Sequence, residues 1–167
     1  MTQHTLKSAN FYAADYRAED SVGFLMKAVM LSITASVNRR LSEHGLTYAQ
    51  WGPLLMIQQR RAYTVAELAR WSNTDAGAMT RLLDRLEAKG LLKRVRSTED
   101  RRVVKVELTT AGTHAIRDVP AILADVLNAH LSGFSKAEWE TMKSYLSRML
   151  ANGEILRAQT DATDSAQ

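Results

Sequence analysis

The hydrophobic residues between Thr74 and Leu108 follow two different periods in succession. Four of them recur at the spacing i, i+3, i+4 and i+7: Met79, Leu82, Leu83 and Leu86. This spacing predicts a helix with one apolar face, which ends at Gly90 because glycine is the usual left-handed cap residue. Two β-prone runs follow, over 91–96 and 103–108, joined by a polar turn. Apolar and charged residues alternate in the second run, so we expect a β-hairpin.

A shorter helical pattern precedes that helix. Thr64 and Glu67 have the spacing of a capping box and begin a predicted helix over Val65–Trp71. We expect four of its residues to face a core: Val65, Leu68, Ala69 and Trp71. Ser72–Thr74 then forms a turn. A short helix, a three-residue turn and a second helix with a polar outer face are typical of a helix-turn-helix, and the hairpin makes it winged.

Longer helices are predicted on both sides of this unit. Apolar residues repeat at three and four over 21–44, and a capping box at Thr47 and Gln50 begins a helix through Gln58. Pro53 is expected to bend that helix or cost it a hydrogen bond. After Leu108 another helix runs to about Leu131, with a kink expected at Pro120.

The last predicted helix begins at a third capping box, Ser135 and Glu138, and its apolar stripe has nearly heptad spacing: Trp139, Met142, Leu146, Met149 and Leu150. The long terminal helices need a surface to cover their apolar faces, and a second copy of the chain is the simplest partner. We therefore expect a homodimer.

The fold class that follows is mainly α with a small β-hairpin, a winged helix-turn-helix with a helical dimerisation lobe. The predicted divisions are an N-terminal arm (1–20), a dimerisation lobe (21–45 and 111–156), a DNA-binding lobe (46–110) and a disordered tail (157–167).

Composition narrows the possible functions. The chain has 167 residues and no cysteine, which excludes disulfides, thiolate zinc sites and cysteine-based redox sensing. No apolar run approaches the roughly 20 residues that span a membrane, and no signal peptide is recognisable, so we expect a cytoplasmic protein without a membrane partner. The four histidines lack metal-ligand spacing. We see no phosphate loop or nucleophile motif, and we expect neither an enzyme nor a bound cofactor.

Positive charge is concentrated in the predicted hairpin. Between Lys89 and Lys105 there are seven cations and two anions, a net charge of +5, whereas the whole chain carries +4. Such a run is usually a solvated charged face. Its position on a hairpin beside a polar helix favours a polyanion such as double-stranded DNA.

Together these motifs resemble the multiple antibiotic resistance regulator (MarR) family of transcription factors. The resemblance rests on four segments, in matching order and spacing: Leu68-Ala69, Thr80 to Leu91, Asp100-Arg101-Arg102, and Leu108-Thr109-x-x-Gly112. It implies a dimer of winged helix-turn-helix chains that represses genes and releases DNA when it senses a small aromatic acid, a phenolic compound or an oxidant. The absence of cysteine removes the thiol-oxidation branch, and Pro53 departs from the family pattern.

Twelve residues are candidates for DNA contact: Asp75, Ala76, Gly77, Thr80, Arg81, Arg85, Lys93, Arg94, Arg96, Arg101, Arg102 and Lys105. Arg81 or Arg85 would read guanine in the major groove, unless they only pair with Asp84 or Asp75. Arg101 would enter the minor groove. Lys93, Arg94, Arg96 and Lys105 would contact phosphates. By resemblance, Arg102 would brace the wing through an acidic residue.

Five residues are candidates for effector binding: Ser36, Arg40, His44, Tyr48 and Trp51. Arg40 would clamp a carboxylate, while Tyr48 and Trp51 would stack on an aromatic ring. The alternative is that Arg40 pairs with a glutamate across the dimer and that Trp51 is plain core. Two other functions also stay open, a constitutive DNA-binding protein without an effector and a winged-helix module that binds an acidic protein.

Overall fold

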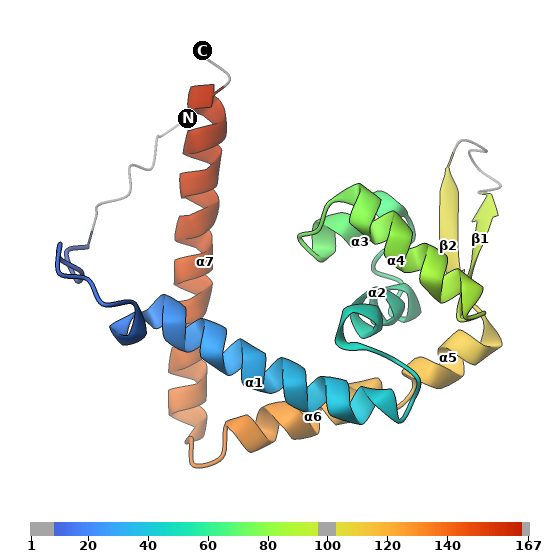
Figure 1. The fold of residues 1–167 in the computed structure, drawn as a ribbon, viewed down its shortest axis with the longest axis horizontal. Coiled ribbons are helices and arrows are strands. Elements are labelled where there is room, and N and C mark those ends of the chain that lie inside the picture. The colour runs from blue at the N-terminus through green and yellow to red at the C-terminus, as the bar shows by residue number, and fades with distance from the viewer. Residues whose placement is uncertain (1–8, 97–102, 165–167) are drawn as a thin grey trace. The chain divides into compact units, whose positions relative to one another are not determined.

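The computed structural model describes residues 9–96 and 103–164 (Figure 1). Over these ranges the helices are η1 (Ala18–Asp20), α1 (Val22–Ser42), α2 (Tyr48–Gln58), α3 (Val65–Trp71), α4 (Ala76–Ala88), α5 (Thr110–Ile116), α6 (Val119–His130) and α7 (Lys136–Asp164), and the strands are β1 (Leu92–Arg96) and β2 (Val104–Leu108). Residues 26–130 form one compact unit, and the remaining described residues form a second. The mainly helical fold with one hairpin is the predicted class.

The predicted capping boxes begin the helices that the sequence assigns to them. At α3 the Thr64 hydroxyl accepts a hydrogen bond from the Glu67 backbone N–H at 3.3 Å. The Glu67 carboxylate in turn accepts from the backbone N–H groups of Tyr63 at 2.8 Å and Thr64 at 3.0 Å. These backbone hydrogen bonds hold the pKa of Glu67 below its ordinary value, because they favour the charged carboxylate.

The single helix predicted between Leu108 and Leu131, with a kink at Pro120, is wrong in detail. The chain forms two helices, and the break falls at Arg117 and Asp118. Pro120 is the second residue of α6. In the first turn of a helix the missing proline N–H would have no partner within the helix, so Pro120 fits there without a kink.

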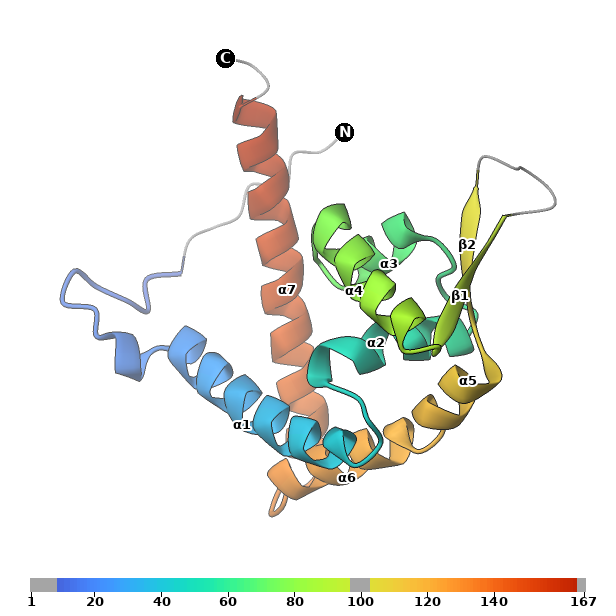
Figure 2. The same ribbon diagram turned by 45° about the vertical axis from the view of Figure 1, so that its right-hand side comes forward.

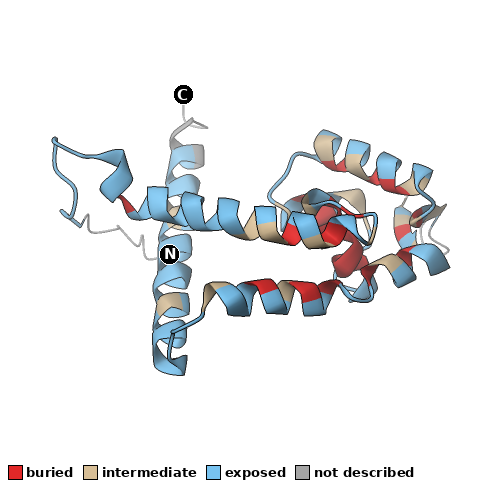
Figure 3. Ribbon diagram, turned by 60° about the horizontal axis from the view of Figure 1, so that its bottom comes forward, coloured by how far each residue is buried: buried red, intermediate tan, exposed pale blue. Residues whose placement is uncertain are grey.

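The predicted end of order at Arg157 is also wrong, because α7 continues to Asp164. This last stretch contains alanine, arginine and glutamine, which favour helices, and adding residues to an existing helix costs little compared with starting one. Almost every described residue of α7 is exposed (Figure 3). None of the described helices is both long and apolar enough to cross a membrane.

The core of the 26–130 unit is built around α2, whose residues 52–57 are all buried. Every other helix and strand of that unit also contributes buried residues to this core, including Leu41, Leu68, Leu83, Leu92, Val106 and Ile116. Pro53 lies within this buried run, and α2 is continuous through it. The proline therefore leaves the acceptor at Ala49 without its usual N–H donor, which is the cost that the sequence predicts.

Trp71 departs from its predicted place in the core. Its side chain is 48% exposed, whereas Leu68 and Ala69 on the same helix are buried. The indole ring instead lies over α2, where a Cβ added to Gly52 would come within 2.8 Å of it. The small residue at position 52 is what permits this close contact.

The hairpin is antiparallel, with Leu92 opposite Leu108 and Arg96 opposite Val104. Its outer edge is joined to the segment before α3, because the Val106 backbone N–H donates to the Tyr63 carbonyl at 2.6 Å. At the base of the hairpin the start of α5 touches the chain after α4. A Cβ added to Gly112 would lie 1.8 Å from the Leu91 carbonyl oxygen, so only glycine fits there.

Helices α1 and α6 lie side by side in both views (Figures 1 and 2). The Ser32 hydroxyl and His130 Nε2 are 3.0 Å apart, and Arg40 pairs with Asp125 at 3.0 Å. The apolar stripe predicted on α1 is buried only at Val37 and Leu41, while its N-terminal residues such as Met26 and Val29 are exposed.

Candidate nucleic-acid interface

Helices α3 and α4 are joined by a tight turn that presents the start of α4. Asn73 has a φ of +49°, a left-handed conformation that asparagine tolerates better than most residues. Asp75 then caps α4, since its carboxylate accepts a hydrogen bond from the Ala78 backbone N–H at 2.8 Å. The turn and cap match the helix-turn-helix predicted from the sequence.

The face of α4 opposite its buried stripe is polar and open. Met79, Leu83 and Leu86 are buried, whereas the predicted reading residues Gly77, Thr80, Arg81 and Arg85 are exposed. The Thr80 hydroxyl donates to the Ala76 carbonyl at 2.8 Å, which leaves its oxygen as an acceptor. Asp75 serves as the cap, so any contact of this carboxylate with DNA remains a prediction.

The two arginines on this face are available for a partner. Within the described part of the chain, neither Arg81 nor Arg85 pairs with a carboxylate. Asp84, the nearest acid on α4, pairs instead with Arg94 of β1 at 2.7 Å. The alternative in which Arg81 and Arg85 are neutralised by Asp84 therefore loses its support.

Arg94 holds the wing against α4. Its guanidinium bonds Asp84 and Glu87, and its backbone N–H donates to Glu87 at 3.1 Å. Burial disfavours the charged guanidinium, but the hydrogen bonds to Asp84 and Glu87 outweigh it and raise the pKa of Arg94 above its ordinary value. The side chain is 25% exposed. The sequence predicts Arg94 as a phosphate contact, and the structure shows its guanidinium bound to Asp84 and Glu87 as a brace between wing and helix. A contact of Arg94 with phosphate stays a prediction.

The other wing cations differ in their surroundings. Lys93 forms an exposed cross-strand pair with Glu107 at 3.3 Å, which is too weak to prevent a contact with phosphate. Arg96 is exposed at the end of β1, and Lys105 is half-buried on β2. Arg101 and Arg102 lie outside the described residues. The phosphate contacts expected of Lys93, Arg96 and Lys105 stay predictions.

A cavity of about 630 Å³ lies between α2, the α3–α4 turn and α4. Its walls are mostly aromatic and apolar: Tyr48, Ala49, Trp51, Gly52, Pro53, Trp71, Ser72, Thr74, Ala78, Met79, Leu82 and Arg85. Tyr48 and Trp51 pack edge to face with ring centroids 6.0 Å apart, and Trp51 packs on Trp71 at 6.5 Å. We name this the α2–α4 cavity.

Two residues that line the α2–α4 cavity each carry a buried polar atom without a hydrogen-bond partner among the described residues, Nε1 of Trp51 and Oγ of Ser72. A buried donor without a partner costs about 1–3 kcal/mol, so such atoms mark places where a ligand can supply the missing acceptor. Arg85 adds a cation to the same lining.

The effector residues predicted from the sequence separate into two groups. Tyr48 and Trp51 line the α2–α4 cavity, while Ser36, Arg40 and His44 do not. Arg40 pairs with Asp125 of its own chain at 3.0 Å, so neither a free carboxylate clamp nor a pair across the dimer is needed to explain it. Trp71, Ser72 and Arg85 also line the cavity, and the sequence does not predict them as effector-binding residues.

Comparison with known proteins agrees with this geometry. The model of the MarR family matches residues 46–104. The multiple antibiotic resistance protein MarR of Escherichia coli (strain K12) is 32% identical over 115 residues, covering 68% of this chain and 80% of that protein. The chain belongs to the MarR family.

One further relative and a solved structure support the assignment of this MarR-family regulator. The organic hydroperoxide resistance transcriptional regulator of Bacillus subtilis (strain 168) is 29% identical over 140 residues, covering 84% of this chain and 92% of that protein. The crystal structure of a mutant E. coli MarR with operator DNA has a TM-score of 0.71 at 30% identity, covering 77% of this chain and 93% of that one. These relatives are transcriptional regulators, so the MarR-family chain described here is not an enzyme.

The resemblance seen in the sequence is therefore confirmed, and the structure explains parts of it physically. The acidic residues of the Thr80–Leu91 segment, Asp84 and Glu87, hold the wing through Arg94. The glycine of the segment after β2, Gly112, lies against the Leu91 carbonyl. These MarR-family motifs maintain the position of the hairpin relative to α4.

Proposed function

We propose that this MarR-family regulator is a homodimeric repressor that binds a pseudo-palindromic operator and is released by a small aromatic acid. One observation carries the DNA-binding part. The exposed face of α4 holds Arg81 and Arg85 without a carboxylate partner among the described residues, directly beside a hairpin rich in cations.

Direct reading of bases falls to α4. An arginine on the exposed face of a recognition helix can donate two hydrogen bonds to guanine O6 and N7, which discriminates by about 1–3 kcal/mol. Arg81 and Arg85 have this position, with Ala76, Gly77 and Thr80 near the start of the helix. Lys93, Arg96 and Lys105 would contact phosphates and Arg101 the minor groove, which adds affinity or shape reading.

Dimerisation follows from the apolar side chains that the single chain leaves exposed. On α1 they include Phe24, Leu25, Val29, Met30 and Leu31, and on α7 Trp139, Tyr145, Leu146, Met149 and Leu150. Soluble proteins rarely expose so many large apolar residues unless another surface covers them. In a two-fold dimer the two α4 helices would enter successive major grooves, about 34–36 Å apart.

The α2–α4 cavity is the effector site that we propose. Its aromatic walls suit a flat ring, and Trp51 Nε1, Ser72 Oγ and Arg85 suit a carboxylate. CouR from Rhodococcus jostii RHA1, which is 23% identical and has the same fold, was solved with p-coumaroyl-CoA bound. In that protein the fold accommodates an aromatic acyl compound.

Arg85 connects the two activities. It belongs to the exposed part of α4 and also lines the α2–α4 cavity. An aromatic acid that draws the Arg85 guanidinium towards its carboxylate removes a DNA contact and favours a different position of α4. Release then depends only on the ligand binding the DNA-free state more tightly than the DNA-bound state.

The test is fluorescence anisotropy of the full chain on DNA from directly upstream of its own gene, against scrambled DNA of equal length. Benzoate, 4-hydroxybenzoate, cinnamate and phenylacetate are then added in turn. We expect sequence-dependent binding that one of these acids reverses. Tight binding that no acid disturbs would indicate a constitutive DNA-binding protein. Binding without sequence preference and with weak salt dependence would indicate a module that binds an acidic protein.

A further inference from the structure

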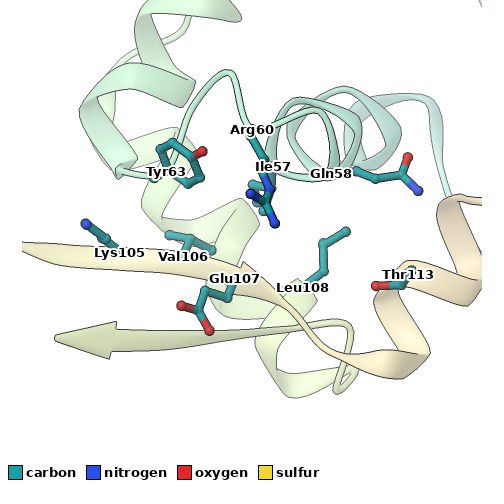
Figure 4. Close-up of a pocket in the computed structure, with 9 residues that line it drawn as sticks. All are labelled: Ile57, Gln58, Arg60, Tyr63, Lys105, Val106, Glu107, Leu108 and Thr113. Carbon is teal, nitrogen blue, oxygen red and sulfur yellow. The ribbon is translucent and has the colours of Figure 1, made fainter. Parts of the chain in front are cut away.

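A second cavity, separate from the α2–α4 cavity, lies at the base of the wing (Figure 4). It has a volume of about 650 Å³ and lies between the C-terminal end of α2, the segment before α3, strand β2 and α5. Its lining residues are Ile57, Gln58, Arg60, Tyr63, Lys105, Val106, Glu107, Leu108 and Thr113. We name it the wing-base cavity.

Arg60 occupies an unusual backbone position at the edge of the wing-base cavity. It follows the end of α2 with a φ of +56°, in the left-handed region where glycine is the usual residue. The Arg61 backbone N–H donates to the Met56 carbonyl at 3.0 Å, which completes the helix cap around it. In Figure 4 the Arg60 side chain extends from this cap towards β2. The cap needs no arginine, so the guanidinium calls for a separate explanation.

The charge around Arg60 favours an anion. Within the described part of the chain no carboxylate pairs with its guanidinium. Glu107, the acidic residue of the lining, forms an exposed pair with Lys93 at 3.3 Å. Lys105 also lines the cavity and has an interaction of its own. Arg60 is therefore the cation that the wing-base cavity offers to an anion.

The floor of the wing-base cavity is apolar. Ile57 and Val106 are buried, Leu108 is half-buried, and the Tyr63 ring forms a side wall. A DNA phosphate would need only an exposed cation and no apolar hollow behind it. A cation above an apolar floor instead matches an amphipathic anion, with a carboxylate at one end and hydrocarbon at the other.

We propose that the wing-base cavity binds a small monocarboxylate, with its carboxylate on Arg60 and its hydrocarbon part on Ile57, Val106 and Leu108. The site uses the C-terminal end of α2, whereas the proposed effector site uses the N-terminal half. The two sites therefore do not share a lining residue, and this proposal stands independently of the effector.

The test uses ¹⁵N NMR titration of the full chain with hexanoate, with 1-hexanol and inorganic phosphate as probes that carry only the hydrocarbon or only the charge. We expect hexanoate to shift the backbone amides of Arg60, Tyr63, Val106 and Thr113, and to bind at least tenfold more tightly than either control. Shifts confined to Trp51 and Trp71 would overturn the proposal, as would phosphate binding as tight as that of hexanoate.

Two variants distinguish the effect of the Arg60 guanidinium on hexanoate binding from its effect on the stability of the fold. Arg60→Gly suits the positive φ, so we expect an unchanged or higher Tm together with at least tenfold weaker hexanoate binding. Arg61→Ala is the matched control, because it removes the same charge one residue away from the lining and should leave hexanoate binding within twofold. Equal loss in both variants, or unchanged binding in Arg60→Gly, would contradict the proposal.

Discussion

The guanidinium of Arg94 on β1 lies 2.7 Å from the carboxylate of Asp84 on α4, and it also bonds Glu87 one turn further along the helix. One side chain thus joins the wing to the recognition helix. In the proposed complex the two elements would meet neighbouring grooves at the same time, and this joint would hold them in position before DNA arrives.

Removing the joint should cost stability. Arg94→Ala leaves Asp84 and Glu87 facing each other without a cation, and hydrogen bonds to charged groups contribute about 1.5–3 kcal/mol each when buried. Since Arg94 is partly exposed, we expect a loss of about 1–2 kcal/mol in the free energy of unfolding by urea denaturation. Lys93→Ala breaks an exposed pair and is the control, with an expected loss below about 0.5 kcal/mol. Equal losses would show that Arg94 is an ordinary surface residue.

Gly112 gives a second stability prediction. A methyl group there would lie 1.8 Å from the Leu91 carbonyl oxygen, so Gly112→Ala must move α5 away from the chain below it. We expect destabilisation of about 2–3 kcal/mol or more, seen as a lower Tm. At Gly153 of α7 a Cβ meets nothing within 4 Å, so Gly153→Ala should be neutral or stabilising by up to about 1 kcal/mol. A stable Gly112→Ala protein would mean that the contact is not as close as described.

The capping of α3 by Glu67 predicts that the stability of the fold depends on pH. Its folded-state pKa is lowered by the backbone hydrogen bonds from Tyr63 and Thr64, so its contribution is fully present above the unfolded value of 4.5. That contribution to stability is lost as the pH falls through the lower folded-state pKa of Glu67. The urea midpoint should therefore fall less between pH 6 and pH 3 in Glu67→Gln than in the unaltered chain. Parallel curves for the two proteins would remove Glu67 as a source of the acid sensitivity.

The effector site is tested by a change that keeps an aromatic ring. Trp51→Phe keeps an aromatic wall in the α2–α4 cavity but removes the Nε1–H donor that lacks a partner among the described residues. Losing one hydrogen bond to a carboxylate should weaken binding of the active aromatic acid roughly tenfold or more by isothermal titration calorimetry. Trp139→Phe on α7 is the control and should leave binding unchanged. Equal affinity of all three proteins would exclude Trp51 from the site.

The sequence predicts the local structure of the chain better than its long-range contacts. The capping boxes at Thr64 and Ser135 and the glycine cap at Gly90 act within a few residues, so their spacing is enough to locate helix ends. Pro120 is ambiguous, because proline marks both a kink and the first turn of a new helix. Its neighbours do not distinguish the two cases.

The site residues that sequence reasoning missed depend on contacts between distant segments. Arg94 is one of several arginines in the predicted wing, and only the packing of β1 on α4 identifies it as a brace. Trp71 looks like a core residue by helical spacing, but Gly52 allows its indole to lie over α2 and form a cavity wall. Arg40 similarly finds Asp125 on a helix that is far away in sequence. No local pattern encodes these pairs.

The reading of bases by α4 is the central claim, and one comparison tests it most directly. Anisotropy titrations of Arg81→Ala and Arg96→Ala are run on the upstream DNA and on scrambled DNA at two salt concentrations. We expect Arg81→Ala to lose about 1–3 kcal/mol of the preference for the upstream sequence. Arg96→Ala should weaken binding to both DNAs equally. It should also lower the slope of log affinity against log salt concentration by about one. A full sequence preference in Arg81→Ala would contradict the assignment of this face of α4 as the reading surface.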